Sequence, residues 1–242
     1  MKLLLAHTKA ELLALVETRG SSSARWPFPR CSSSCPPPTR LTSVASANFA
    51  TGSFMTFAVF TVTFFQLGVG TANERENPWS SFVRTLPASP LYRNAAKVTT
   101  AAVLALLAAL VLVLASAAPT PLDLPLVRWP RIFLALAAGG VMMGMLGTAL
   151  AYLVTPKAAL PLANLIYLPL AFMGGMWMPP ELLPRIVQEI SPYLPSRQWM
   201  ELVWPAVGDG SWDVGHWLAV AGFTVAFAAL AGWAQRRDEA VR

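Results

Sequence analysis

The sequence predicts an all-α, polytopic membrane protein, and three observations carry this prediction. Charged residues make up 12% of the 242 residues and hydrophobic residues 55%, whereas soluble domains carry about 25% charged residues. The charges enclose five intervals, each longer than the roughly 20 apolar residues that a helix needs to cross a bilayer. These intervals do not alternate as transmembrane β-strands do. With two cysteines, Cys31 and Cys35, the chain also has no disulfide framework of a small secreted module.

The chain begins with two segments that differ sharply in composition. Residues 1–18 have the spacing of an amphipathic interfacial helix, with Leu5, Leu12 and Val16 on its apolar face. Residues 19–40 contain six Ser, five Pro and four Arg and could not be buried in lipid. We hypothesise that a compensated frameshift, or an aberrant gene model, has replaced a first membrane span here. The alternative is a genuine disordered linker between the first segment and residues 41–242, the membrane domain.

Five membrane-spanning helices are predicted within residues 41–242. The predicted spans are 49–70, 98–117, 132–154, 158–178 and 214–233. In the fourth span, Pro169 and the Gly174-Gly175 pair predict a kink or a local break. In the third span, Gly140-x3-Gly144 predicts close helix packing. The aromatic residues of the first span are interpreted as packing residues rather than cargo contacts.

Basic residues near the ends of the spans predict the orientation. The loops on one side carry eight Lys or Arg residues and the loops on the other side carry four. The richer side, which includes the C-terminus, is therefore predicted to be cytoplasmic. Five spans then place residues 1–48 outside, although these carry six basic residues. This conflict is the reason for the hypothesis of a missing first span.

The segment after the first span has the pattern of a short amphipathic helix. Asn77 suits the N-cap and Pro78 the first helical position, while Pro87 ends the helix. One interpretation is an interfacial helix resting on lipid headgroups, and the other is a docking surface that transmits force from a soluble partner. The apolar residues that share one face are Trp79, Phe82, Val83 and Leu86.

Between the fourth and fifth spans lie two further amphipathic patterns, at 182–190 and 199–204. The residue spacing alone fits a pair of helices lying on the outer leaflet, with aromatic rings at the membrane interface.

Several motifs, in their order and spacing relative to the spans, resemble the ABC type-2 transporter permease family. They are Gly68–Gly70 with Glu74–Glu76 and 84–90, then Pro156-Lys157-Ala158 with Pro161, Ala163 and Asn164, and then 174–181 with Leu183-Pro184 and Ser191-Pro192. The resemblance covers roughly residues 41–235 and the first 18. It implies re-entrant helices at 182–204 that close the outer end of a pathway.

Members of this family have six helices per subunit, pair as dimers and bind two cytoplasmic ATPase subunits. The first of the six spans is absent here, where residues 19–40 stand. The resemblance implies that residues 78–86 form a coupling helix against the ATPase. The predicted ATPase-coupling loop comprises Glu74, Arg75, Glu76, Trp79, Phe82, Val83, Arg84 and Leu86.

Few polar residues lie within the spans, and three residues are candidates for a substrate pathway: Gln66, Asn164 and Met173. Gln66 and Asn164 are also the kind of residue that forms interhelical hydrogen bonds. Apart from His216 near an outer end, no acid or base lies within a span, so ion coupling is not expected. The chain also lacks the phosphate-binding loop of P-loop ATPases. We expect no catalytic residue, metal or cofactor in this chain.

The leading hypothesis is therefore the transmembrane permease subunit of an ATP-binding-cassette exporter, driven by a separate ATPase. The expected partners are a cytoplasmic ATP-binding-cassette ATPase, a second permease subunit in a homo- or heterodimer and the lipid bilayer, without nucleic acid. The expected location is the bacterial inner or plasma membrane. Two alternatives remain: a non-transporting scaffold or decayed permease, and an intramembrane enzyme, which would need a nucleophile with a base or a set of metal ligands.

Overall fold

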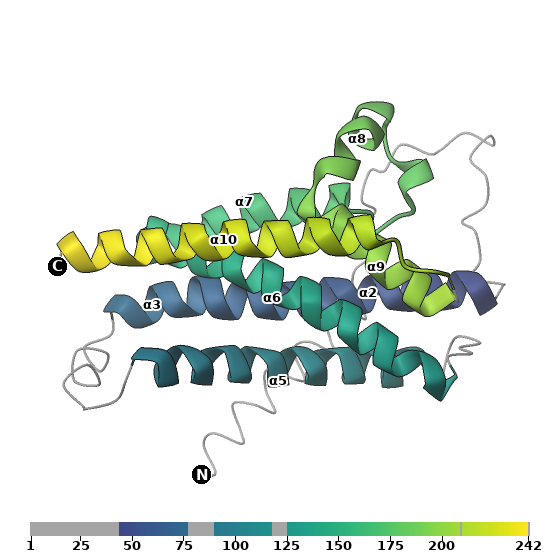
Figure 1. Ribbon diagram of the computed structural model, residues 1–242, viewed down its shortest axis with the longest axis horizontal. Coiled ribbons are helices and arrows are strands. Elements are labelled where there is room, and N and C mark those ends of the chain that lie inside the picture. The colour runs from purple at the N-terminus through teal and green to yellow at the C-terminus, as the bar shows by residue number, and fades with distance from the viewer. Residues whose placement is uncertain (1–43, 77–89, 118–124, 209, 242) are drawn as a thin grey trace, which may run out of the picture. The chain divides into compact units, whose positions relative to one another are not determined.

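The computed structural model describes residues 44–76, 90–117, 125–208 and 210–241, and all of them belong to the compact unit Leu41–Arg242 (Figure 1). Every regular element in these ranges is a helix, so the prediction of an all-α membrane protein is confirmed. The elements in chain order are α2 (Val44–Phe65), η1 (Gln66–Gly70), α3 (Thr71–Glu76), α5 (Pro90–Ala117), η2 (Leu126–Arg128), α6 (Trp129–Leu153), α7 (Pro156–Met173), η3 (Pro180–Leu182), α8 (Arg185–Ile190), η4 (Ser191–Tyr193), α9 (Pro195–Gly208) and α10 (Val214–Val241).

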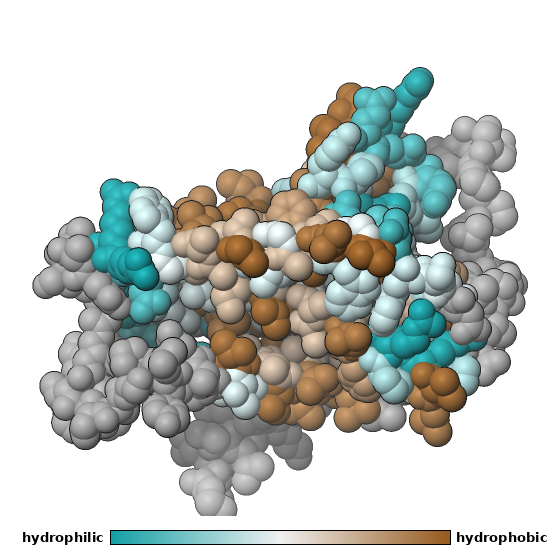
Figure 2. Space-filling model, viewed as in Figure 1, coloured by the Kyte–Doolittle hydropathy of each residue, from teal (hydrophilic) through white to brown (hydrophobic). Residues whose placement is uncertain are grey.

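Four stretches of the described chain are long and apolar enough to cross a membrane: 48–75, 126–153, 156–173 and 214–238. The fifth predicted span lies in α5, a helix of 28 residues that contains the apolar stretch Lys97–Val113. Figure 2 shows apolar side chains over the middle of the helices on the face in view, with hydrophilic groups gathered toward both ends. This distribution matches a protein whose middle lies in lipid.

The predicted break in the fourth span is confirmed at the two glycines. Helix α7 ends at Met173, and the N–H groups of Gly174 and Gly175 donate to the carbonyls of Leu170 and Phe172. Gly175 has a φ of 83°, a conformation that a residue without Cβ adopts at low cost. The span is therefore shorter than the predicted 158–178, and the chain turns before η3.

A stripe of glycines on α6 packs against α2 and η1. A Cβ at Gly144 would lie 2.7 Å from Cδ1 of Leu67, and a Cβ at Gly147 would lie 2.6 Å from the carbonyl oxygen of Phe64. The two backbones therefore approach more closely than any larger residue allows, as the Gly140-x3-Gly144 pattern predicts. Opposite this stripe, residues 66–70 form a π-helical turn in which Leu67 and Gly68 are buried.

Aromatic rings surround Tyr167 of α7. Its ring centroid lies 4.8 Å from that of Phe60, 5.4 Å from that of Phe57 and 5.3 Å from that of Phe65. The hydroxyl groups of Tyr167 and Thr61 form a hydrogen bond. Phe60 and Phe64 are fully buried, so packing explains most of the aromatic stripe, although Phe54 is exposed.

Helix α5 packs chiefly against α2 among the described elements. Ala101, Ala105 and Ala109, spaced four residues apart, are buried on this face. Most leucines and valines on the other sides of α5 are exposed, as expected for a helix at the lipid boundary.

We predict that Gly147→Ala destabilises the protein by about 1–3 kcal/mol, the usual cost of overpacking. The new methyl group would meet the backbone of Phe64 and Gly68, which cannot move aside as a flexible side chain could. Thermal unfolding in detergent measures the effect. The matched control is Gly222→Ala on α10, where no atom lies within 4 Å of the new Cβ. Equal unfolding temperatures for the two variants would contradict the close α6–α2 contact.

Candidate functional site

The segment between α7 and α10 places a buried helix at one end of the bundle, here called the α9 end. Helix α9 contacts α2, α6, α7 and α10. Six of its apolar side chains are completely buried: Trp199, Met200, Leu202, Val203, Ala206 and Val207. A helix on the surface of the outer leaflet would keep one face in contact with lipid headgroups. The second amphipathic pattern therefore forms a helix packed within the bundle, and its re-entry into the membrane stays a prediction from the family resemblance.

Helix α8 is built differently. Ile186 and Ile190, two members of the predicted apolar face at 182–190, are exposed, whereas Leu183 is buried. Figure 1 shows α8 projecting from the other helices beside α9. The first amphipathic pattern therefore lies at the periphery of the described chain, and the second lies in its core.

Trp199 anchors α9 to α6. Its indole Nε1 donates to the carbonyl oxygen of Ala135 at 2.9 Å. Gly139 lies directly beneath the ring, since a Cβ there would be 2.0 Å from the indole. The buried indole N–H thus has a partner, and the missing side chain at 139 makes room for the ring.

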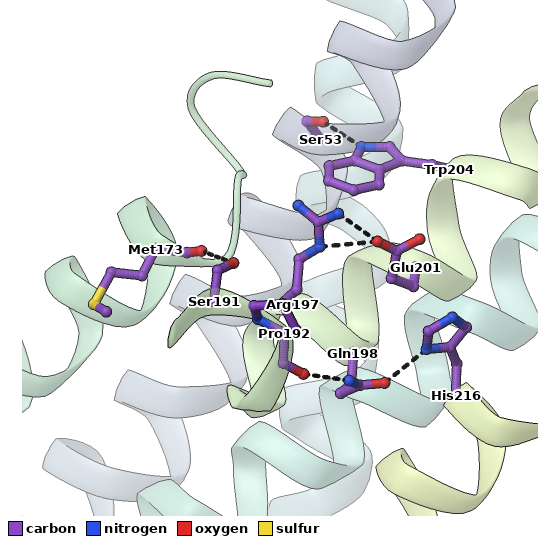
Figure 3. Close-up of polar contacts among 9 residues, drawn as sticks. All are labelled: Ser53, Met173, Ser191, Pro192, Arg197, Gln198, Glu201, Trp204 and His216. Carbon is purple, nitrogen blue, oxygen red and sulfur yellow. Dashed lines mark hydrogen bonds and ion pairs between the residues drawn. The ribbon is translucent and has the colours of Figure 1, made fainter. Parts of the chain in front are cut away.

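Polar side chains secure the beginning of α9 (Figure 3). The Nε of Arg197 donates to Oε1 of Glu201 at 2.9 Å, and the guanidinium lies 4.7 Å from the ring centroid of Trp204. Trp204 in turn donates from Nε1 to Oγ of Ser53 on α2 at 3.1 Å. These contacts link α9 to α2 through groups that are partly buried.

Two more contacts in Figure 3 join α9 and η4 to neighbouring helices. Oε1 of Gln198 and Nδ1 of His216 lie 2.7 Å apart, which links α9 to α10. Oγ of Ser191 donates to the carbonyl oxygen of Met173 at 2.6 Å, which links η4 to the end of α7. His216, the one ionisable group predicted near a span end, therefore serves a structural contact.

Arg128 of η2 and Arg131 of α6 bind backbone carbonyls at and just after the C-terminal end of α9. Nη1 of Arg128 donates to the carbonyl oxygen of Val207 at 2.8 Å, and Nη2 of Arg131 donates to that of Gly210 at 3.0 Å. The last carbonyls of a helix lack partners within the helix, and cations there are favourable for its dipole. Both ends of α9 are thus held by other parts of the chain.

The opposite end of the bundle, here called the α3 end, is held by Arg75. Its Nη1 donates to the carbonyl oxygens of Ala151 and Val154 at the end of α6, and its Nη2 pairs with Oδ1 of Asp238 on α10. The Arg75 side chain is 10% exposed and that of Asp238 is 14% exposed. The guanidinium also lies 5.2 Å from the ring centroid of Tyr152. Arg75 therefore ties α3 to both α6 and α10.

A second ion pair lies beside it. Nζ of Lys97 on α5 lies 2.6 Å from Oε2 of Glu74 on α3. Glu74 and Lys97 stand on either side of residues 77–89 in the sequence, so this pair connects the two helices that flank that segment. The side chains are 53% and 34% exposed, so the pair contributes at most about 1 kcal/mol to stability.

The structure covers the predicted ATPase-coupling loop in part. Glu74 is exposed as expected, whereas Arg75 turns into the protein, and Glu76 ends α3 with a side chain outside the described set. The remaining predicted residues lie outside the described residues: Trp79, Phe82, Val83, Arg84 and Leu86.

The three predicted pathway residues are not brought together. Gln66 is exposed on η1, toward the α3 end, whereas Met173 ends α7 near the α9 end. Asn164 is exposed, and its Nδ2 donates to the carbonyl oxygen of Leu160 on its own helix. Their role in a substrate pathway remains a prediction.

The sequence patterns did not identify two residues that make extensive contacts in the structure. Asp238 stands directly after Arg236 and Arg237, and an acid in a basic tail one turn beyond a span is a signal for an ion pair. Tyr167 is the other, and no local pattern predicts that four phenylalanine rings would gather around it.

Comparisons with known proteins identify a family and a related protein. A family model described as ABC-2 family transporter protein matches residues 35–233. The Bacillus subtilis (strain 168) protein named "Putative transport permease YvfS" is 28% identical over 189 residues, which are 78% of this chain and 77% of that relative. No solved structure gives a significant match.

We predict that Arg75→Gln lowers the free energy of unfolding by about 3–5 kcal/mol, because the change removes a largely buried ion pair with Asp238 and the hydrogen bonds to two carbonyls at the end of α6. Thermal unfolding in detergent measures this loss. Arg236→Gln, at an exposed position of α10, is the control and should change stability little. If Arg75→Gln were as stable as the control, Arg75 would not be the residue that joins α3 to α6 and α10.

Proposed function

Because the chain belongs to the ABC-2 family of transporter proteins, we propose that it is the membrane permease subunit of an ATP-binding-cassette exporter. It forms part of the substrate pathway, and a separate cytoplasmic ATPase supplies the energy. ATP hydrolysis then resides in the partner chain, and this chain holds no catalytic residue, metal or cofactor. A second permease subunit, identical or different, completes the pathway.

The observation that carries this proposal is the difference between the two ends of the bundle. At the α9 end, a buried helix is bound to its neighbours by Trp199, Arg128 and Arg131. At the α3 end, Glu74–Lys97 and Arg75–Asp238 connect the flanks of residues 77–89 to α5 and α10. This arrangement suits a permease in which α9 closes one end of the substrate pathway. The partner ATPase would then move the helices from the α3 end.

The same arrangement supports a coupling role for residues 78–86. A displacement of that segment would reach α3 and α5 through the chain itself, and Arg75 would carry it to α6 and α10. Rigid-body movement of packed helices is a common way in which such motions open a pathway. The α3 end and the C-terminus then face the cytoplasm of a bacterial inner or plasma membrane, in agreement with the exposed Arg236 and Arg237.

We predict that an ATP-binding-cassette ATPase co-purifies with the tagged chain from its native host, and that Phe82→Ala weakens this association about tenfold or more, as loss of an interface anchor does. Phe54→Ala is the matched control, because Phe54 is exposed on α2, outside the predicted loop. The amount of ATPase per permease and its rate of ATP hydrolysis are the measurements. Absence of any such ATPase, or transport by the reconstituted chain alone, would overturn the proposal.

We predict that Glu74→Lys reduces coupling of ATP hydrolysis to transport, because it places a second cation beside Lys97. Stability should change little, since the pair is exposed. Adding Lys97→Glu restores an opposite pair and should restore coupling. Transport per ATP hydrolysed, measured with the partner ATPase, distinguishes the outcomes. If the double variant stays as impaired as Glu74→Lys, Glu74 acts through the ATPase surface and not through α5.

A further inference from the structure

Two neighbouring cavities lie along α5 and α6 and share part of their lining. The first, of about 150 Å³, lies between α2, α5 and α6. The second, of about 220 Å³, lies toward the α3 end and is also lined by α10. Leu67, Val98 and Met145 line both cavities, so the two are adjacent and their combined length suits one elongated molecule. We call this space the α5–α6 slot.

The first cavity is apolar. Its wall is made of hydrocarbon side chains and Gly140, apart from Thr63, whose hydroxyl donates to the carbonyl oxygen of Val59 at 2.8 Å. Small residues create the space, namely Ala101, Ala102 and Ala105 on α5 with Ala137 on α6. A polar group placed here would find no partner, and burying it would be unfavourable. The first cavity therefore fits a hydrocarbon chain.

The second cavity is polar at its far end. Thr71, Thr148, Tyr152 and Gln235 line it together with Lys97, which is the charged residue among its lining residues. The ammonium of Lys97 has three N–H donors, and Glu74, the partner of Lys97, lies outside the lining. A cation among hydroxyl and amide groups suits an anionic headgroup, and basic pockets between membrane helices bind such headgroups.

The dimensions and the location agree with a lipid. From Val98 to Ala109 the apolar cavity follows α5 for roughly 16 Å at 1.5 Å per residue, which is close to half of a ~30 Å hydrocarbon core. The polar cavity lies toward the α3 end, where the exposed Arg236 and Arg237 of α10 stand. Ala102 and Ala137 are exposed, so the slot opens toward the membrane.

We propose that an anionic phospholipid binds in the α5–α6 slot, with an acyl chain between α2, α5 and α6 and its phosphate at Lys97. This lipid is a resident of the protein and not its cargo, since Gln66, Asn164 and Met173 are not among the lining residues. It holds α5 against α6, two helices that meet chiefly through α2 in the described chain. The proposal does not depend on the ATPase partnership.

The test uses the full chain, purified in mild detergent and incubated with equal amounts of phosphatidylglycerol and phosphatidylcholine that carry the same acyl chains. Native mass spectrometry counts the lipids retained per protein. We expect at least a threefold preference for phosphatidylglycerol in the unchanged protein. Lys97→Gln should abolish the preference, whereas Lys97→Arg should keep it. Lys157→Gln is the matched control, because Lys157 is exposed on α7 and does not line the slot.

Three further variants distinguish a lipid in the slot from bulk lipid and from a second copy of the chain. Glu74→Gln breaks the ion pair of Lys97 but leaves its charge, so the preference should persist. Ala102→Phe fills the slot from an exposed position and should reduce retention of both lipids by about one molecule per protein, whereas Ala226→Phe, exposed on α10, should not. Thermal unfolding and size-exclusion chromatography establish that each variant is folded.

Two results would overturn the proposal. One is the same lipid ratio in the unchanged protein, Lys97→Gln and Lys157→Gln, which would mean bulk lipid only. The other is a shift of Ala102→Phe from dimer to monomer with unchanged lipid retention, which would mean that a second copy fills the slot.

Discussion

The close contact of α6 with α2 and η1 is the interaction on which the rest of the structure depends. Lipid tails are as apolar as the surfaces of these helices, so tight packing rather than escape from water holds them together. Gly144 and Gly147 allow that packing because they carry no side chain at the point of contact. Trp199 of α9, the length of α10 and Arg75 of α3 all rest on α6. The position of α6 against α2 therefore influences contacts at both ends of the bundle.

The sequence is sufficient to predict the membrane helices, the glycine contact and the break after Met173, because charge-free length, small-residue spacing and paired glycines are local properties. It is not sufficient to predict that α9 is buried, since its apolar residues fit a helix on the membrane surface equally well. The partners of Arg75 cannot be predicted from the sequence either, because Asp238 lies 163 residues away in the chain and a carbonyl group has no sequence signature. Arg75 was expected near an ATPase surface for its place beside Glu74, and only the packing of α3 on α6 turns it inward.

The chemistry of the two ends differs in a way that agrees with their proposed roles. At the α9 end most bonds run from a side chain to a backbone carbonyl, as for Trp199, Arg128 and Ser191, so the helix is fixed to the fold itself. At the α3 end Arg75 also donates to backbone carbonyls, but Glu74–Lys97 joins two side chains that are partly exposed. Such pairs exchange with water and with other charges at little cost. A partner can therefore act on the α3 end without breaking the contacts that hold α9.

The π-helical turn at 66–70 has a geometric consequence for everything that follows it. A turn of this kind accommodates one residue more than an α-helical turn, and one residue corresponds to a rotation of about 100° around the helix axis. Helices α2, η1 and α3 follow one another without a break, and the π-helical turn changes the direction in which the side chains of α3 point relative to those of α2. Without this turn, the Arg75 side chain would point in a different direction around the helix axis and would not meet Ala151 and Asp238. One additional residue in the turn between α2 and α3 therefore determines which neighbouring residues the side chains of α3 can contact.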